Sequence, residues 1–334
     1  MDKIIDIHTH FFAEYTFEEV PKEYSTEAPT IVEKSGTEAY VLTGKSAPIR
    51  VSKAFYSVKE RIEEKSKEGV DIEVLSVHPS MFFYHVKVER AKVFSQLLNN
   101  AIYNIIRDNP DDFAGLANVP MQDVPSAIEE MTRAVKKLNM IGVELGSHIN
   151  GRNLSDAVFW PFYKKAEELG ALLFIHPNPI NSIGGDRMSR YNLGLTIGNI
   201  TETTLAAGSM ILGGVFKEFP NLKVCYAHGG GFIPYQIGRL DQAFNIRHSS
   251  NGLKEPPSYY LNKIFVDTNV FNMKALEFLV NQMGEGSNVI LGSDSPMDMH
   301  DHEIVSKIRA LGLRDDKEKQ ILGGNMYKLL ERRV

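Results

Sequence analysis

Cysteine, long apolar runs and excess positive charge are all scarce in this sequence. The 334 residues include one cysteine, Cys225, which excludes an internal disulfide and a cysteine-based zinc site and fits a reducing compartment. No apolar run approaches the roughly 20 residues that a transmembrane helix needs, and Asp2 and Asp6 stand where a signal peptide would be basic. We therefore predict a cytoplasmic protein that does not act on membranes.

The charge balance excludes a second group of functions. Lysine and arginine total 37 against 42 aspartates and glutamates, a net charge of −5, so the sequence offers no basic surface for nucleic acid. The hydrophobic share of 43% and the charged share of 24% are typical of a globular enzyme rather than a disordered or fibrous chain. A small anionic substrate would have to be attracted by a few well-placed arginines.

Short apolar runs alternate with longer amphipathic segments along most of the chain. The apolar runs are rich in Ile, Val, Leu or Phe and are bounded by Gly, Pro, Asn or Asp, as buried parallel strands are. They are residues 3–9, 72–77, 113–119, 141–146, 171–176, 222–228, 263–268 and 288–292. The helical patterns between and after them include residues 89–108, 123–138, 155–169, 201–217, 232–246, 273–283, 303–312 and 315–331.

This alternation predicts a (β/α)8 TIM barrel that forms a single α/β domain over residues 1–334. A doubly wound open sheet is the competing fold, but the strand count and the absence of a GxGxxG motif after the first strand favour the barrel. Residues 13–50 interrupt the pattern with a polar, turn-rich stretch that has short β-like pieces at 31–33 and 39–42. We expect this insertion to form a small lobe that covers the barrel mouth.

Polar residues lie at the predicted carboxyl ends of four strands. His8 and His10 end the first strand, His176 ends the fifth, His228 ends the sixth, and Asp294 follows the eighth. In a TIM barrel these strand ends meet at one mouth, where active sites are built, and the two side chains of an H-x-H pair share one face of a regular strand. Three imidazoles and a carboxylate suit a divalent cation such as Zn²⁺, with Mn²⁺ and Fe²⁺ as alternatives.

Other interpretations of the histidines stay open on these residues alone. Each could be a polar strand end, and a closed structural zinc site is a further alternative, although such sites commonly use cysteine. His78 and His85 could line a pocket, but loop residues are the simpler interpretation. The sequence HEIVS, which begins at His302, starts like the zinc motif HExxH but lacks its second histidine. We therefore interpret His300 and His302 as part of a solvated loop and helix cap.

Longer stretches around these residues resemble a known family. DIHTH, FIHP, VCYAHGGGFIPYQIGRLD and ILGSDSP resemble the amidohydrolase superfamily. Residues 120–131, 202–231 and 323–330 narrow the likeness to its aminocarboxymuconate-semialdehyde decarboxylase-like branch. The resemblance therefore spans essentially the whole chain.

The resemblance implies a role for each residue at the strand ends. It implies that His8, His10, His176 and Asp294 bind one divalent metal, for which zinc is favoured, and that no organic cofactor is needed. It further implies that His228 is the catalytic acid or base and that Asp294 can also accept a proton. The fourth strand, IGVELGSH, lacks the lysine with which other members of the superfamily hold a second metal.

The same resemblance assigns residues to the substrate. Arg50 and Arg239 match positions that hold substrate carboxylates, for which the fork of guanidinium donors is suited. In the family the second arginine comes from the partner subunit, which implies a homodimer with Arg239 acting across the interface. Asn192 and His85 are expected at the pocket wall but depart from the family pattern, so the identity of the substrate is open. Glu144, on the fourth strand, is expected to face inward and is a further candidate for contact with the metal site.

The expected activity is non-oxidative decarboxylation of a small unsaturated or aromatic carboxylic acid. The metal would polarise an oxygen and His228 would move the proton. The same groups support hydrolysis of an amide, lactone or C–C bond, or hydration of a double bond, so a hydrolase or a hydratase is the alternative. A metal-binding module without activity would be expected to lack a ligand or His228, and the sequence has all of them.

Overall fold

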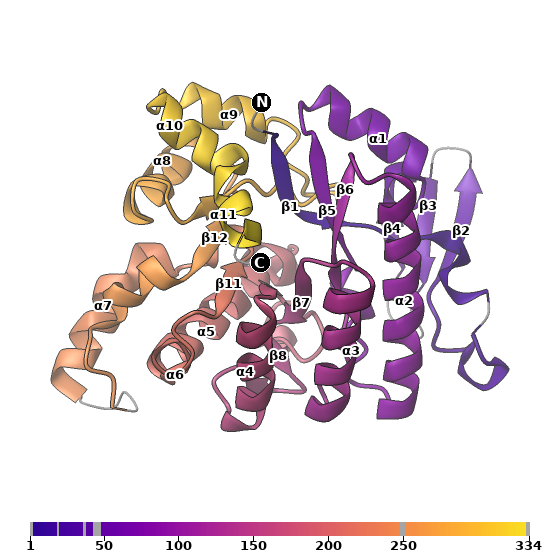
Figure 1. Ribbon diagram of the computed structural model, residues 1–334, viewed down its shortest axis with the longest axis horizontal. Coiled ribbons are helices and arrows are strands. Elements are labelled where there is room, and N and C mark those ends of the chain that lie inside the picture. The colour runs from indigo at the N-terminus through magenta and orange to yellow at the C-terminus, as the bar shows by residue number, and fades with distance from the viewer. Residues whose placement is uncertain (1–2, 19, 36–37, 43–47, 248–251, 332–334) are drawn as a thin grey trace.

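The computed structural model describes residues 3–18, 20–35, 38–42, 48–247 and 252–331. Within these ranges the central element is an eight-stranded parallel sheet that curls into a barrel (Figure 1). Its strands, in spatial order, are β1 (Ile5–His10), β5 (Ile72–Ser76), β6 (Phe113–Ala117), β7 (Gly142–Gly146), β10 (Leu172–His176), β11 (Lys223–Tyr226), β12 (Phe265–Asp267) and β13 (Val289–Ile290). The predicted TIM barrel is confirmed.

Backbone hydrogen bonds beyond the short strand β13 close the barrel. The amide of Ile7 donates to the carbonyl of Leu291 at 3.0 Å, and the amide of Asp294 donates to the carbonyl of His8 at 2.9 Å. A parallel bridge between Thr9 and Ser295 continues this pairing. The first strand and the segment after the last strand therefore lie side by side, which brings His8 and His10 next to Asp294.

Helices surround the barrel on its outer face (Figure 1). They are α1 (Val58–Lys67), α2 (Val88–Asp108), α3 (Val124–Lys137), α4 (Trp160–Leu169), α5 (Asn199–Leu212), α6 (Val215–Glu218), α7 (Ile233–Arg247), α8 (Met273–Gln282), α9 (Ile304–Ala310), α10 (Asp315–Lys319) and α11 (Asn325–Glu331). The helix expected over 201–217 is divided at Gly214, whose φ of 79° is left-handed and ends a regular helix. The one expected over 315–331 is interrupted by a π-helical turn at Gln320–Gly324.

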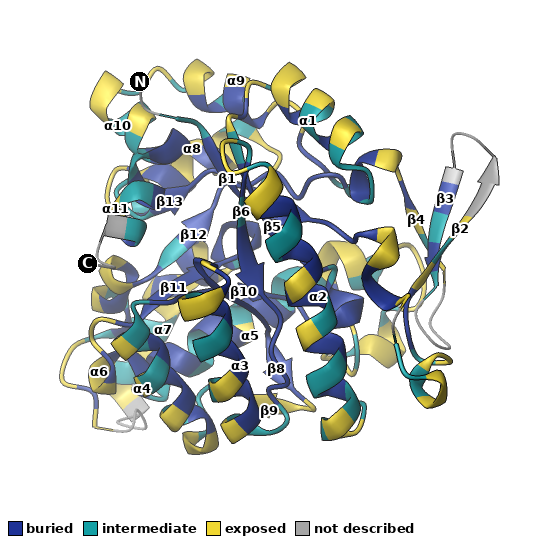
Figure 2. Ribbon diagram, turned by 45° about the vertical axis from the view of Figure 1, so that its right-hand side comes forward, coloured by how far each residue is buried: buried dark blue, intermediate teal, exposed yellow. Residues whose placement is uncertain are grey.

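The apolar core has two parts, one inside the barrel and one between the barrel and its helices. Inside, Ile7, Phe174 and Cys225 are fully buried and belong to a cluster that includes Met326 and Leu329 of α11. The C-terminal helix thus packs on the interior cluster, and Figure 2 shows the barrel strands buried along most of their length. Cys225 is a buried free thiol, as its apolar surroundings in the sequence indicate.

The insertion after β1 forms a small antiparallel sheet of β2 (Thr30–Ser35), β3 (Glu38–Leu42) and β4 (Ile49–Val51). Figures 1 and 2 show this sheet beside α2, outside the ring of barrel strands. Phe17, in the 3-10 turn before it, packs edge-to-face on Phe94 of α2 with ring centroids 5.4 Å apart. Residues 19, 36–37 and 43–47 of the insertion lie outside the described ranges, and coverage of the barrel mouth stays a prediction.

None of the helices in the described ranges is long and apolar enough to cross a lipid bilayer.

Candidate metal centre

The two histidines of β1 reach the barrel mouth because the strand is irregular. Ile7 belongs to the interior apolar cluster, so in a regular strand His8 would point to the outer face. The pairing of β1 with β5 shifts register between Asp6 and Thr9, and a bulge of this kind re-aims the side chains that follow it. The two histidines share one face, as expected, and the bulge turns that face toward the interior of the barrel.

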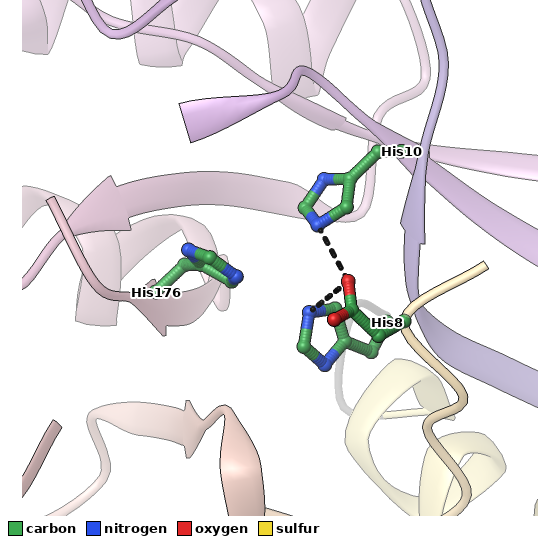
Figure 3. A group of neighbouring side chains, drawn as sticks. His8, His10 and His176 are labelled. Carbon is green, nitrogen blue, oxygen red and sulfur yellow. Dashed lines mark ion pairs between the residues drawn. The ribbon is translucent and has the colours of Figure 1, made fainter. Parts of the chain in front are cut away.

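Four of the predicted residues form one buried group, which we call the His–Asp cluster: His8, His10, His176 and Asp294. One ligand atom from each lies within 4.8 Å of those from the others. Asp294 Oδ1 lies 3.3 Å from Nε2 of His10 and 3.5 Å from Nε2 of His8, and Figure 3 shows the three imidazoles facing a common space. The ring centroid of His176 lies 5.1 Å from that of His8 and 5.2 Å from that of His10.

Each histidine of the cluster is held by an oxygen acceptor at its Nδ1 atom. Nδ1 of His8 lies 2.7 Å from Oδ2 of Asp267, that of His10 lies 2.9 Å from the carbonyl oxygen of Val77, and that of His176 lies 3.1 Å from its neighbouring carbonyl at Pro177. These oxygens accept a hydrogen bond from Nδ1–H, so in the neutral form of each ring the proton is on Nδ1 and the lone pair is on Nε2. Nδ1 held in this way is the usual arrangement in histidines that bind metal through Nε2.

Opposing effects set the charges in the cluster. Burial acts to raise the pKa of Asp294, but the charge of His8 and the hydrogen bond from His10 outweigh it and hold that pKa well below its ordinary value. Burial, together with the nearby His8 and His10 rings, lowers the pKa of His176 well below its ordinary value. Asp294 and His176 are thereby favoured as carboxylate and neutral imidazole, which are the ligand forms that a metal requires.

The donor set of the cluster fits a divalent cation. Nε2 of His8 is buried and has no hydrogen-bonding partner among the residues that the structure describes, and a buried polar atom without a partner is costly. Three imidazole nitrogens and a carboxylate oxygen suit Zn²⁺, Mn²⁺ or Fe²⁺. Neighbouring ligands of tetrahedral zinc lie about 3.4 Å apart, as follows from metal–ligand distances of about 2.1 Å. The cluster could therefore bind such an ion with small side-chain adjustments.

His228 lies next to the His–Asp cluster without belonging to it. Its ring centroid is 5.2 Å from those of His8 and His176, and its Nδ1 is buried with no partner in the described part of the chain. Burial, and then the charge of His8, lowers the pKa of His228 to about 4. Both His228, with φ 54°, and Asp294, with φ 66°, adopt the left-handed conformation, which is strained for such residues and is concentrated at functional sites.

Asp267 is a residue of this site that the sequence analysis missed. Its Oδ2 holds His8, while its Oδ1 accepts hydrogen bonds from the amides of Gly229 at 2.8 Å and Asn269 at 3.1 Å. It thereby ties the His8 ring to the HGGG turn that carries His228. A signal was present, since Asp267 is the next-to-last residue of the strand predicted over 263–268, but a carboxylate that orients a ligand does not follow a motif of its own.

Glu144 and His78 also adjoin the cluster. Glu144 is fully buried, and neither carboxylate oxygen has a hydrogen-bonding partner in the described ranges. Burial raises the pKa of Glu144 to about 8, while the charge of His10 acts to lower it. The ring of His78 lies 5.9 Å from that of His10, so His78 is packed against the site and is more than a loop residue.

The residues expected to bind substrate lie on the surface. Arg50, on β4 opposite Tyr40, and Arg239, on α7, are exposed, as are Asn192 and His85. None of the four is a member of the buried His–Asp cluster, which is confined to the barrel mouth. Their roles stay predictions, and for Arg239 an exposed position is what a contribution to a partner subunit requires.

An α/β barrel with a buried His–Asp cluster at the carboxyl ends of its strands defines a class, the metal-dependent hydrolases and lyases built on TIM barrels. Residues 5–332 match the sequence model of the family described as amidohydrolase. The chain belongs to this family.

Named proteins are similar to the chain over nearly its whole length. The chain is 37% identical to 2-amino-3-carboxymuconate-6-semialdehyde decarboxylase of Dictyostelium discoideum, over 98% of this chain and 91% of that protein. It is 26% identical to 2-keto-4-carboxy-3-hexenedioate hydratase of a Sphingobium strain, over 99% and 97% of the two chains. Its fold is similar to that of a dihydroxybenzoic acid decarboxylase of a Polaromonas strain, whose structure was solved with manganese and 2-nitroresorcinol. The two structures have a TM-score of 0.80 and 20% sequence identity, over 100% of this chain and 98% of the other.

Proposed function

We propose that this protein is a metal-dependent carboxy-lyase that removes the carboxylate of a small unsaturated or aromatic acid as CO₂, without oxidation. The observation that carries the proposal is the His–Asp cluster, in which residues from three separate strand ends meet beside His228. The similarity to a decarboxylase over 98% of the chain supports this reaction over others of the family.

His8, His10, His176 and Asp294 would hold one divalent ion. Zinc is favoured by the nitrogen-rich donor set, and manganese and iron are the alternatives. The manganese bound in the Polaromonas enzyme supports manganese as an alternative. When bound, such an ion acts as a Lewis acid that polarises an oxygen atom and stabilises negative charge. No organic cofactor enters the proposal.

The reaction requires a proton at the carbon atom that loses its carboxylate. As the C–C bond breaks, its electron pair stays on the substrate carbon, CO₂ leaves, and one proton replaces it. His228 is placed to hold and deliver this proton through a ring nitrogen, because its ring lies beside the cluster and its Nδ1 has no partner within the described ranges. Asp294, in contact with His8 and His10, is a second site at which a proton can be held.

The substrate would be held by residues outside the cluster. Arg50 and Arg239 bind its carboxylates in this proposal, with Arg239 supplied by the second subunit of a homodimer, and Asn192 and His85 line the pocket wall. The insertion would cover the mouth and bring Arg50 over it. The single buried cysteine supports a cytoplasmic protein.

A hydratase is the second candidate, because the Sphingobium relative matches 99% of the chain. A hydrolase of the same superfamily is the third. The experiment that separates them incubates the zinc- or manganese-loaded protein with a panel of unsaturated and aromatic carboxylic acids, including 2-amino-3-carboxymuconate semialdehyde and 2-keto-4-carboxy-3-hexenedioate. Mass spectrometry then identifies the product. We expect a product that is lighter by one CO₂; a product heavier by one water, with no CO₂ released, would contradict the proposal.

A further inference from the structure

A second group of potential metal ligands lies away from the His–Asp cluster. We call it the outer cluster: Glu64, Glu68, His300 and His302. Glu64 lies in α1, and Glu68 is the first residue after the end of that helix. Because the two glutamates are four residues apart, their side chains share one face of the helix. The two histidines lie in the loop between β13 and α9, and one ligand atom from each residue lies within 4.8 Å of the others.

His300 is buried, which the interpretation of a solvated loop did not anticipate. Its side chain is 1% exposed, and its Nδ1 has no hydrogen-bonding partner anywhere in the described ranges. Its Nε2 lies 3.0 Å from Oε2 of Glu68 as an ion pair, and this nitrogen too is without a hydrogen-bonding partner in the described ranges. A nine-tenths buried imidazole without a hydrogen bond is an incomplete site unless another group binds to it.

The surroundings of the outer cluster favour a cation. It adjoins a hollow of about 460 Å³ that is lined by four glutamates but only two lysines. His302 is 62% exposed at its side chain, so an ion can enter from solvent.

The two imidazoles lie closer together than two positive charges would favour. The ring centroids of His300 and His302 are 3.9 Å apart, and both rings contact Glu68, His302 through Nδ1 at 2.7 Å. Two protonated imidazoles at this distance repel each other, whereas one divalent ion between neutral rings satisfies both and neutralises the glutamates. Two imidazoles and two carboxylates are a donor set for Zn²⁺ and similar divalent ions.

We propose that Glu64, Glu68, His300 and His302 bind a second divalent transition-metal ion that joins α1 to the loop after β13. This loop carries Asp294: the amide of Met297 donates to the carbonyl of Asp294 at 3.0 Å, and that of His300 donates to the carbonyl of Met297 at 2.9 Å. The outer ion therefore anchors the segment that supplies the carboxylate of the His–Asp cluster. The site does not depend on the reaction proposed above.

Zinc stoichiometry tests this proposal. The full-length protein is stripped with a chelator and titrated with Zn²⁺ against a chromophoric competitor, and zinc is then counted by mass spectrometry after desalting. Wild type should hold about two zinc ions per chain, and both Glu64→Gln and His302→Ala should hold about one, with at least a roughly tenfold weaker second equivalent. Glu63→Gln is the matched control, because it removes the same charge from the same helix outside the cluster, and it should hold about two.

A second pair of variants separates the two sites. His176→Ala should keep about one zinc ion, in the outer cluster, and zinc should raise its melting temperature. His176→Ala/His302→Ala should keep none and show no such rise. Circular dichroism establishes that each variant is folded. The proposal is overturned if Glu64→Gln and His302→Ala hold as much zinc as Glu63→Gln, if His176→Ala holds none, or if the second equivalent binds only at millimolar zinc.

Discussion

Replacing Asp267 by asparagine should weaken metal binding at the His–Asp cluster by about 10- to 100-fold, the effect usual for a group that orients a histidine ligand. This corresponds to about 1.4 to 2.8 kcal/mol. All four ligands stay in place in this variant, so any loss must come from the orientation and protonation of His8.

The geometry explains why an amide cannot replace this carboxylate. If the asparagine NH₂ group faces His8, it meets the Nδ1 atom 2.7 Å away, and the imidazole must move its proton to Nε2, the atom that faces the cluster. If the asparagine side chain is turned the other way, its NH₂ group faces the backbone N–H groups of Gly229 and Asn269. In the wild-type protein these two groups donate hydrogen bonds to the Asp267 carboxylate at 2.8 and 3.1 Å. Either orientation places donor against donor or removes the lone pair from the ligand atom.

The assay is a competition titration with Zn²⁺ and Mn²⁺ in a His302→Ala background, so that the outer cluster does not contribute. Asp123→Asn is the control, because Asp123 also accepts a backbone amide, that of Ser126 at 3.0 Å, at the start of α3. Asparagine caps a helix about as well as aspartate, so this variant should bind metal as wild type does. Equal affinity of Asp267→Asn and Asp123→Asn would refute the assignment of Nε2 of His8 as a ligand atom.

Three further predictions follow from the same geometry. His228→Ala should keep its metal but lose about 10²- to 10⁴-fold in turnover, measured as CO₂ release; loss of metal together with activity would show that His228 is a ligand. Arg50→Ala and Arg239→Ala should raise KM more than they lower kcat. If Arg239 acts across a dimer, mixing the two variants should restore part of the activity lost at low substrate concentration, whereas no restoration would count against a shared site. Arg61→Ala should lower the free energy of unfolding, measured by urea denaturation, by about 3–5 kcal/mol. In the wild-type protein Nε of Arg61 lies 2.5 Å from Oε2 of Glu73, and the variant leaves this buried carboxylate without its guanidinium partner. An unchanged denaturation midpoint would contradict this.

The barrel could be predicted from the sequence because its strands are buried on both faces. Such strands are continuous apolar runs, and the end of each run marks the position at which a polar residue reaches the mouth. His176, the last residue of β10, was located in this way. The helix α1 was not among those predicted, because its sequence VKERIEEKSK is almost wholly polar. Its buried face is made by Arg61 and Lys65, which bury their aliphatic stems and satisfy their charges with partners distant in sequence.

The parts of the site that escaped prediction depend on contacts between distant segments. The bulge that turns His8 inward arises from pairing with β5, and a period of two along the strand cannot show where the register shifts. Asp267 reaches the site through its contact with His8, 259 residues away in the chain. The burial of His300 likewise depends on α1, whose position beside the loop after β13 follows from closure of the barrel between its first and last strands.

The most direct test of the central claim measures CO₂ and metal together. The protein is stripped of metal, reloaded with one equivalent of Zn²⁺ or Mn²⁺, and given an acid from the panel whose reacting carboxylate carries ¹³C. The proposal predicts one labelled CO₂ for each molecule of substrate consumed, no CO₂ from the stripped protein, and recovery of activity when the metal is restored. Substrate consumption by the reloaded protein without labelled CO₂, or equal CO₂ release from the stripped protein, would contradict it.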